Sequence, residues 1–273
     1  MAYTTIDTPE SYFNVVTYTG NGSTQSITGV GFQPDLVWIK NFTSGSNYDH
    51  VLYDAVRGVT KNLHSNTTDV EDTQTDGLTA FGTDGFTVGA DSKSNLNSGT
   101  FASWNWKASG SGSSNSDGSI TSTVSANTTS GFSICQWTGS GANATIGHGL
   151  GAVPKMYIVK NVSDTNDWNV YHHKTGNEYR LFLNTTAARE DNASAWNDTS
   201  PTSSVFSIGT NTNVNQSGST MIAYVFAEKT GFSRFGSYTG NGTTGAGPYI
   251  YTGFKPGFIM IKRTDSSGNW NMY

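Results

Sequence analysis

The chain has 273 residues, a formal charge of −5 at pH 7 and only 13% charged residues. It contains no cluster of Lys and Arg, which argues against nucleic acid as a partner, because binding phosphates requires concentrated positive charge. It also has no basic, apolar leader and no run of the about 20 apolar residues that a membrane helix needs, so a soluble protein without a signal peptide is expected.

The residues that take the place of charge indicate an all-β protein. Aromatic residues make up 12% of the chain, and they occur together with β-branched Thr, Val and Ile. Both kinds of residue favour strands. Cys135 is the single cysteine, which excludes an intrachain disulfide and a Cys-based zinc site. We expect Cys135 to be a small, buried, apolar side chain.

In chain order, the first recurring feature is a Gly-rich phrase. YTGNG at 18–22 returns as WTGSG at 137–141 and again as YTGNG at 238–242. Asn-Gly is a preferred pair in tight hairpin turns, where the backbone adopts positive φ. The phrase therefore predicts a hairpin in each of three copies of one domain.

Longer phrases follow each copy at nearly constant spacing. GFQPDLVWIKN at 31–41 corresponds to 151–161 and 253–263, which aligns one proline in each, namely Pro34, Pro154 and Pro256. The segment TFASWNW, which begins at Thr100, likewise corresponds to the one that begins at Thr220. The offset between the first two copies stays between 118 and 120 residues. A constant register of this kind predicts duplicated folds.

Period-two patterns predict the strands. Short apolar runs at 35–41 and 155–161 are typical of buried strands. Alternation places Trp104 and Trp106 on one face of their strand, and we expect that face to point into the core. Helical spacing is weak, with one short candidate at 185–196.

The expected fold is a series of tandem β-sandwich domains of jelly-roll or concanavalin A-like, lectin-like topology. The predicted parts are an N-terminal attachment segment at 1–11, repeat 1 at 12–107, a flexible Gly/Ser/Thr-rich linker at 108–130 with a possible edge strand at 119–125, repeat 2 at 131–229 and a truncated repeat 3 at 230–273. Because half a sandwich would expose its core, we expect the chain to be a fragment of a longer polypeptide.

The sequence has no motif of a known catalytic site: it lacks a nucleophile elbow, a phosphate-binding loop and a zinc-binding helix, so an enzyme is not expected. His172 and His173 would point to opposite faces of a strand, which disfavours a metal site. Four acidic residues could supply oxygen ligands to calcium, but their spacing fits no EF-hand loop and a solvated acidic loop is the simpler interpretation; they are Asp69, Glu71, Asp72 and Asp76. No cofactor is predicted.

Aromatic residues followed by Asn suggest a candidate glycan site. Trp168 with Asn169 and Trp270 with Asn271 occupy matching positions in the second and third copies, and His50 or Tyr48 fills that place in the first. An aromatic face can stack on a sugar ring while amides bind its hydroxyls. Alternatively, both tryptophans belong to the core or to an interface between domains.

The phrases at 12–41, 52–63, 75–89 and 104–133 resemble a domain that recurs, often in tandem, in large structural proteins of marine bacteriophages such as pelagiphages and cyanophages. The resemblance covers nearly the whole chain. It implies a virion protein of the tail-fibre or head-appendage type, and it brings no catalytic residues with it.

Two functions follow as expectations from this resemblance. In the first, a tail fibre presents its sandwiches for attachment to glycans of the host surface. In the second, a decoration protein braces the capsid or tail and binds no ligand. A depolymerase is a third, more remote alternative. The resemblance also implies assembly into the virion in the host cytoplasm, contacts with other virion proteins through 1–11, and a homo-oligomer, by analogy a trimer.

Overall fold

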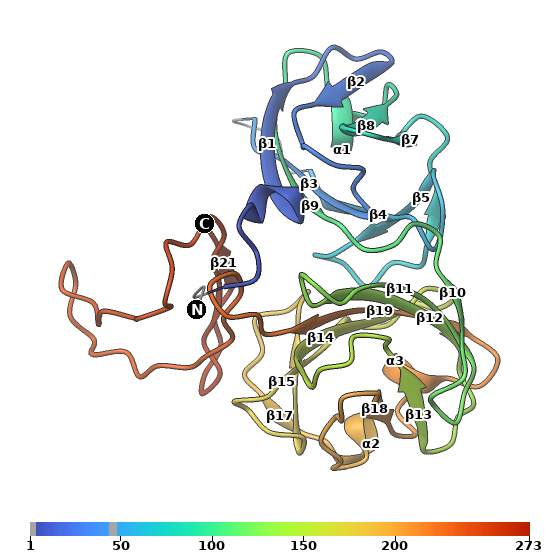
Figure 1. Ribbon diagram of the computed structural model, residues 1–273, viewed down its shortest axis with the longest axis vertical. Coiled ribbons are helices and arrows are strands. Elements are labelled where there is room, and N and C mark those ends of the chain that lie inside the picture. The colour runs from blue at the N-terminus through green and yellow to red at the C-terminus, as the bar shows by residue number, and fades with distance from the viewer. Residues whose placement is uncertain (1–3, 44–47) are drawn as a thin grey trace.

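The computed structural model describes residues 4–43 and 48–273, and it confirms an all-β protein. Within these residues the strands form a six-stranded sheet, an eight-stranded sheet and three smaller sheets, in which neighbouring strands are antiparallel. The strands group into an N-terminal unit (residues 12–107), a middle unit (residues 113–227) and a C-terminal segment (residues 231–273), which Figure 1 shows around a common centre.

The N-terminal unit is built from two facing sheets. Its larger sheet has the order β1-β9-β3-β4-β5-β6, and its smaller sheet has the order β2-β8-β7. The elements, preceded by the short helix η1 (Pro9–Ser11), are β1 (Phe13–Thr19), β2 (Gln25–Thr28), β3 (Leu36–Asn41), β4 (His50–Asp54), β5 (Lys61–His64), β6 (Asp72–Thr73), β7 (Leu78–Gly82), β8 (Gly85–Val88), α1 (Ser92–Asn95) and β9 (Thr100–Trp106).

The middle unit has the same strand order, extended by two strands at one edge. Its larger sheet runs β10-β11-β12-β19-β14-β15-β16-β17 and its smaller sheet pairs β13 with β18. Its elements are β10 (Ser113–Asn115), β11 (Ser122–Asn127), β12 (Phe132–Thr138), β13 (Ala144–Gly147), β14 (Pro154–Asn161), β15 (Asn169–His172), β16 (Tyr179–Phe182), β17 (Glu190–Asp191), α2 (Ala193–Trp196), β18 (Val205–Ile208), α3 (Thr212–Asn215) and β19 (Thr220–Ala227). Strands β3 and β14 confirm the predictions at 35–41 and 155–161, and α2 lies inside the predicted helical segment.

Each unit has its own apolar core between its two sheets. In the N-terminal unit this core contains Val37 and Phe101, and in the middle unit it contains Tyr157 and Trp196. Val37, Phe101 and Tyr157 are buried because alternate residues of each central strand point to this side, and Trp196 reaches the core of the middle unit from α2. Two facing antiparallel sheets over one core are the architecture of a sandwich.

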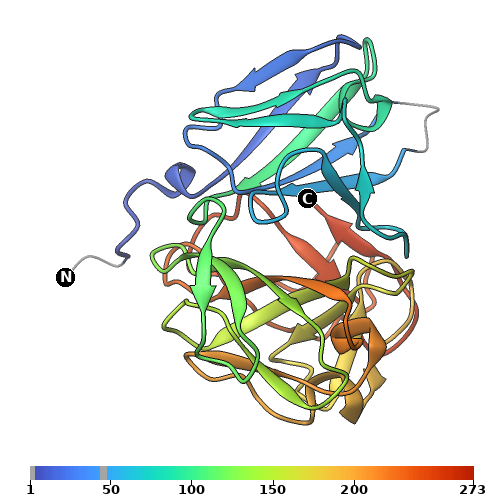
Figure 2. The same ribbon diagram turned by 90° about the vertical axis from the view of Figure 1, so that its right-hand side faces the viewer.

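The other face of each large sheet contributes to a third cluster, named here the shared cluster. It joins residues from all three parts of the chain, which adjoin one another in the ribbon diagrams of Figures 1 and 2. Its members include Leu36, Trp38, Leu52 and Leu63 from the N-terminal unit, Ile134, Ile158, Trp168, Val170 and Tyr224 from the middle unit, and Met260, Trp270 and Met272 from the C-terminal segment. Trp104 and Trp106 pack against this cluster. The predicted alternation is therefore right, but the expected face is wrong: Phe101, on the opposite face, points into the core of the unit.

The C-terminal segment contains one hairpin, β20 (Met260–Lys262) and β21 (Trp270–Met272). Its register repeats that of β14 and β15, because Met260 faces Met272 as Ile158 faces Val170. Residues 234–259 contain no strand. The hairpin packs against the shared cluster.

The Gly-rich phrase does not close a hairpin, so this prediction is wrong. It connects β1 to β2 and β12 to β13, strands that lie in different sheets. The turn is held by the end of α1, because Asn95 Oδ1 accepts from Asn21 N and Asn95 O accepts from Gly22 N. Gly22 has φ of +67°, as expected for this phrase, and a Cβ on Gly20 would lie 2.3 Å from Leu96 O. In the middle unit a Cβ on Gly139 would likewise lie 2.1 Å from Gln216 O, and Gly141 has φ of +72°, so both turns need one glycine for the close approach and one for positive φ.

The linker prediction also needs correction. Residues 108–130 include β10 and β11, which belong to the sheet of the middle unit, and β11 is not an edge strand because it pairs with both β10 and β12. The start of the connection is fixed to the N-terminal unit, since the Asp35 carboxylate accepts hydrogen bonds from Ala108 N and Gly110 N.

Of the attachment segment at 1–11, residues 1–3 lie outside the described residues. The remainder forms η1 and buries Ile6, which is 3% exposed. In the part of the chain that the structure describes, no helix is long and apolar enough to cross a membrane.

Candidate functional site

The most elaborate polar arrangement of the molecule lies where the N-terminal and middle units meet. Arg57, which follows β4, donates from Nε to Asp54 Oδ2 at 2.5 Å and from Nη1 to Glu71 Oε2 at 3.2 Å. Tyr224, on β19 of the middle unit, donates its hydroxyl to Asp54 Oδ2 at 2.8 Å. The side chains of Arg57 and Asp54 are 1% and 0% exposed.

Electrostatics within this network keep the Arg57 guanidinium charged. Burial disfavours the charged guanidinium of Arg57, but Asp54, Tyr224 and Glu71 more than offset this, and the pKa of Arg57 is raised above its ordinary value. Burial and the neighbouring Asp54 carboxylate raise the pKa of Tyr224 well above its ordinary value. Tyr224 therefore stays protonated and donates to Asp54, which ties the middle unit to a buried ion pair of the N-terminal unit.

A tryptophan at the start of the second strand of a hairpin makes the same kind of contact in two places. Trp168 Nε1, in the middle unit, donates to the carbonyl of His64 in the N-terminal unit at 2.9 Å. Trp270 Nε1, in the C-terminal segment, donates to the carbonyl of Phe182 in the middle unit at 2.7 Å. His64 and Phe182 are the last residues of corresponding strands, β5 and β16. Each tryptophan thus reaches the preceding part of the chain.

One backbone hydrogen bond beside the tryptophan also occurs at corresponding positions of both junctions. Between the two units, Glu71 N donates to Val162 O at 2.9 Å. Between the middle unit and the C-terminal segment, Arg189 N donates to Thr264 O at 3.0 Å. Glu71 and Arg189 precede corresponding strands, β6 and β17, by one residue.

A third hydrogen bond also occurs at both junctions, and here the later part of the chain donates to the earlier part. Asn166 N donates to Thr68 O at 3.1 Å across the first junction, and Gly268 N donates to Thr186 O at 2.8 Å across the second. Successive parts of the chain therefore contact one another through three hydrogen bonds at corresponding positions. A chance contact between unrelated surfaces would not repeat this pattern.

A buried lysine completes the junction between the units. Lys160 on β14 is 0% exposed, and its Nζ donates to the carbonyls of Thr68, Asn161 and Asp164. Burial lowers the pKa of Lys160 to about 8, although nearby carboxylates oppose this change. The ammonium is thus held by three carbonyl dipoles, one of them from the other unit.

This lysine makes stability depend on pH. Since the pKa of Lys160 is lower in the folded chain, the unfolded chain binds more protons above about pH 8. The contribution of Lys160 to the free energy of unfolding should rise by about 1–2 kcal/mol between pH 8 and 9.5, while the raised pKa of the buried Cys135 thiol acts in the opposite direction. Urea titrations of the unmodified chain and of the variants at several pH values measure this contribution as a difference in slope. A Lys160→Met variant should lose it and Lys155→Met, on the same strand, should keep it; equal slopes in both variants would contradict the assignment.

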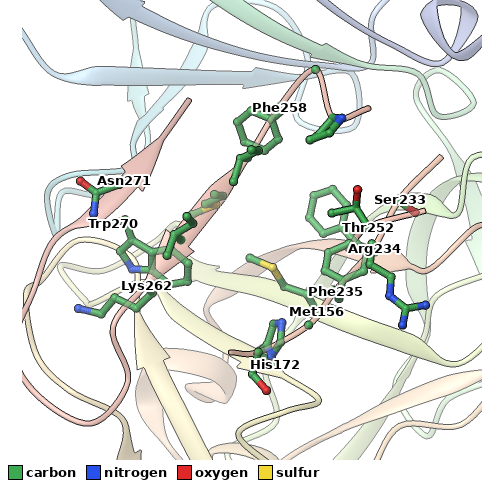
Figure 3. Close-up of a pocket in the computed structure, with 18 of the residues that line it drawn as sticks. Met156, His172, Ser233, Arg234, Phe235, Thr252, Phe258, Lys262, Trp270 and Asn271 are labelled. Carbon is green, nitrogen blue, oxygen red and sulfur yellow. The ribbon is translucent and has the colours of Figure 1, made fainter. Parts of the chain in front are cut away.

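A cavity of about 1340 Å³ lies between the three parts of the chain. Figure 3 shows Phe258 and Lys262 along one side, Ser233, Arg234 and Phe235 along the other, and Met156 and His172 from the middle unit below. Aromatic rings of the N-terminal unit also line it, including Phe13 and Trp106. The lining is mainly apolar and joins the shared cluster.

The predicted glycan residues do not form one exposed site. Trp168 and Asn169 are 0% exposed, so a sugar platform at Trp168 is wrong, and its alternative position in an interface is confirmed. Asn169 Oδ1 accepts from Arg180 Nη1 instead. In the C-terminal segment Trp270 is partly buried against the shared cluster and Asn271 is exposed beside it. His50 lies in the N-terminal unit, at the start of β4.

The other candidate groups are also separate. His172 lines the cavity, whereas His173 Nε2 contacts the carbonyl of Phe235 at 3.0 Å. Among the acidic residues, Glu71 pairs with Arg57 and Asp69 contacts His64. In residues 4–43 and 48–273, no group of three or more His, Cys, Asp or Glu side chains is arranged to hold a metal ion.

Sequence reasoning missed the residues that make the junction. Asp54 and Arg57 are three residues apart next to a buried strand, in a chain with few charges, and this spacing was the available signal. Their partner Tyr224 is 170 residues from Asp54 along the chain. That distance hides the contact from any local pattern.

Comparison with known proteins gives one result. The family model described as "Domain of unknown function (DUF7483)" matches residues 8–273. No curated protein and no solved structure matches the chain. The match extends over both units and the C-terminal segment, and the chain therefore belongs to this family, the domain of unknown function DUF7483.

Proposed function

We propose that this protein is a structural component of a bacteriophage virion, in which tandem β-sandwich units brace one another and the particle. The observation that carries the proposal is the recurrence of three hydrogen bonds at corresponding positions of two successive junctions. A surface built to receive the next unit suits an assembly protein. The sequence resemblance to phage structural proteins supplies the virion as the setting.

Duplication of one domain accounts for this recurrence. The two large sheets share the order β1-β9-β3-β4-β5-β6 and β12-β19-β14-β15-β16-β17, and Pro34 and Pro154 are buried just before or at the start of matching strands. Strand β1 is next to β9 and β12 is next to β19, and in the smaller sheets β2 pairs with β8 and β13 pairs with β18. This arrangement supports a jelly-roll type of sandwich.

The bracing role is favoured over attachment to glycans. Trp168, the leading candidate for sugar stacking, is enclosed between the units, and its indole N–H is already used. A buried ion pair and a buried lysine also lie at this junction, and such groups hold two surfaces in one register. These features serve contact between units. They leave no exposed platform at Trp168.

Electron microscopy tests the proposal directly. Antibodies raised against the purified chain are applied to phage particles whose genome encodes it, followed by gold-labelled secondary antibody. We expect gold at the tail or at head appendages. Particles of an unrelated phage, treated in the same way, are the control and should carry no gold. Particles that remain unlabelled while the lysate contains the free chain would overturn the virion assignment. Light scattering of the purified chain tests the expected trimer separately.

A further inference from the structure

The C-terminal segment has two backbone edges without a strand partner among the described residues. One edge belongs to β20, which pairs with β21 on its other side only. The other is residues 233–239, which correspond to β1 through the match of Tyr238 with Tyr18 and pair only in an isolated bridge of Ser233 with Lys229. Unpaired strand edges are templates for an added strand.

The two complete units show what normally lies between such edges. In the middle unit β19 lies between β12 and β14, and in the N-terminal unit β9 lies between β1 and β3. Tyr224 on β19 faces Ile134 on one side and Ile158 on the other. Met260 on β20 corresponds in register to Ile158, so the place of β19 beside β20 is open.

The cavity lies at this open place. Its volume of about 1340 Å³ exceeds the about 300–1000 Å³ of ordinary small-molecule pockets. Its apolar walls continue the shared cluster through Phe226, Phe132 and Trp106, which are in mutual aromatic contact. Phe258 extends this series, because its ring contacts Phe13, Trp104 and Trp106.

A nearby loop is exposed where its counterpart is buried. Tyr249 and Tyr251 are 88% and 74% exposed, and Ile250 between them is 45% exposed. In the N-terminal unit the corresponding Ile27 is 4% exposed, because β2 pairs with β8 and covers the core. Neighbouring apolar side chains exposed in this way mark an interaction site.

We propose that the space between β20 and residues 233–239 is a strand-acceptor site for one β-strand of a partner protein. The occupant has the pattern of β9 and β19, in which alternate aromatic residues point towards the shared cluster. Its backbone pairs with β20 on one side and with residues 233–239 on the other. Its aromatic side chains fill the cavity.

A peptide-binding experiment on the full chain tests this site. The probe is a fluorescent peptide with the sequence of residues 219–228, STMIAYVFAE. The matched control is the same peptide with N-methyl groups on alternate residues, which removes backbone donors and keeps the side chains. We expect saturable one-to-one binding of the probe and about tenfold or greater weakening for the control.

Hydrogen exchange locates the strand. The probe should slow amide exchange in 258–262 and in 233–239 by about tenfold or more, and should leave β14 and β19 unchanged. Equal binding of both peptides, or no slowing at these two segments, would overturn the proposal. Protection of the same amides by self-association of the chain without peptide would also overturn it, since a second copy would then be the occupant.

Discussion

Replacement of Arg57 by Met is expected to lower the free energy of unfolding by about 3–5 kcal/mol. The variant removes the guanidinium that pairs with Asp54, whose side chain is 0% exposed, and leaves that carboxylate buried with Tyr224 as its one remaining side-chain donor. An isolated buried charge is far more costly than an exposed one. Urea denaturation followed by circular dichroism measures the loss.

Two further variants make the Arg57 prediction specific. Lys61→Met removes a partly exposed cation 3.7 Å from Glu71, and it should change stability by less than about 1 kcal/mol. The double variant Asp54→Leu with Arg57→Met should be more stable than Arg57→Met alone, because the fully buried carboxylate is removed together with its cation. A loss below about 1 kcal/mol in the single variant would show that the buried pair does not hold the junction.

Replacement of Trp168 by Ala should cost a similar amount, about 3–5 kcal/mol. The indole is 0% exposed in the shared cluster, and its removal leaves a cavity and a His64 carbonyl without its donor. Trp270→Ala should cost less, because Trp270 is only partly buried in the corresponding place. Chemical denaturation monitored by circular dichroism gives both values.

A thiol probe shows which part of the chain opens. Burial raises the pKa of Cys135 to about 12, and the thiol lies in the core of the middle unit, so it should react with a thiol reagent only when that unit unfolds. Trp168→Ala should speed this reaction. Tyr249→Ala, at a residue 88% exposed, should change stability by less than about 0.5 kcal/mol and leave the reaction unchanged. Equal effects of the two variants would contradict a role for Trp168 at the junction.

Local residue patterns determined much of the fold. Period-two apolar runs located β3 and β14, and the repeated phrases aligned the strands that later showed the same order in both large sheets. The positive φ at Gly22 also followed from its phrase. These features depend on steric limits of the backbone and on side-chain alternation, which act over a few residues and are therefore visible in the sequence.

Only the tertiary structure decided which surfaces meet. Alternation put Trp104 and Trp106 on one face, but an apolar face can cover the core of its own unit or contact another unit, and the pattern is identical in both cases. The burial of Trp168 and the pairing of Asp54 with Tyr224 likewise depend on how the two sheets pack. Contacts between residues more than 100 positions apart are set by the packing of whole sheets, and no local spacing in the sequence encodes that packing.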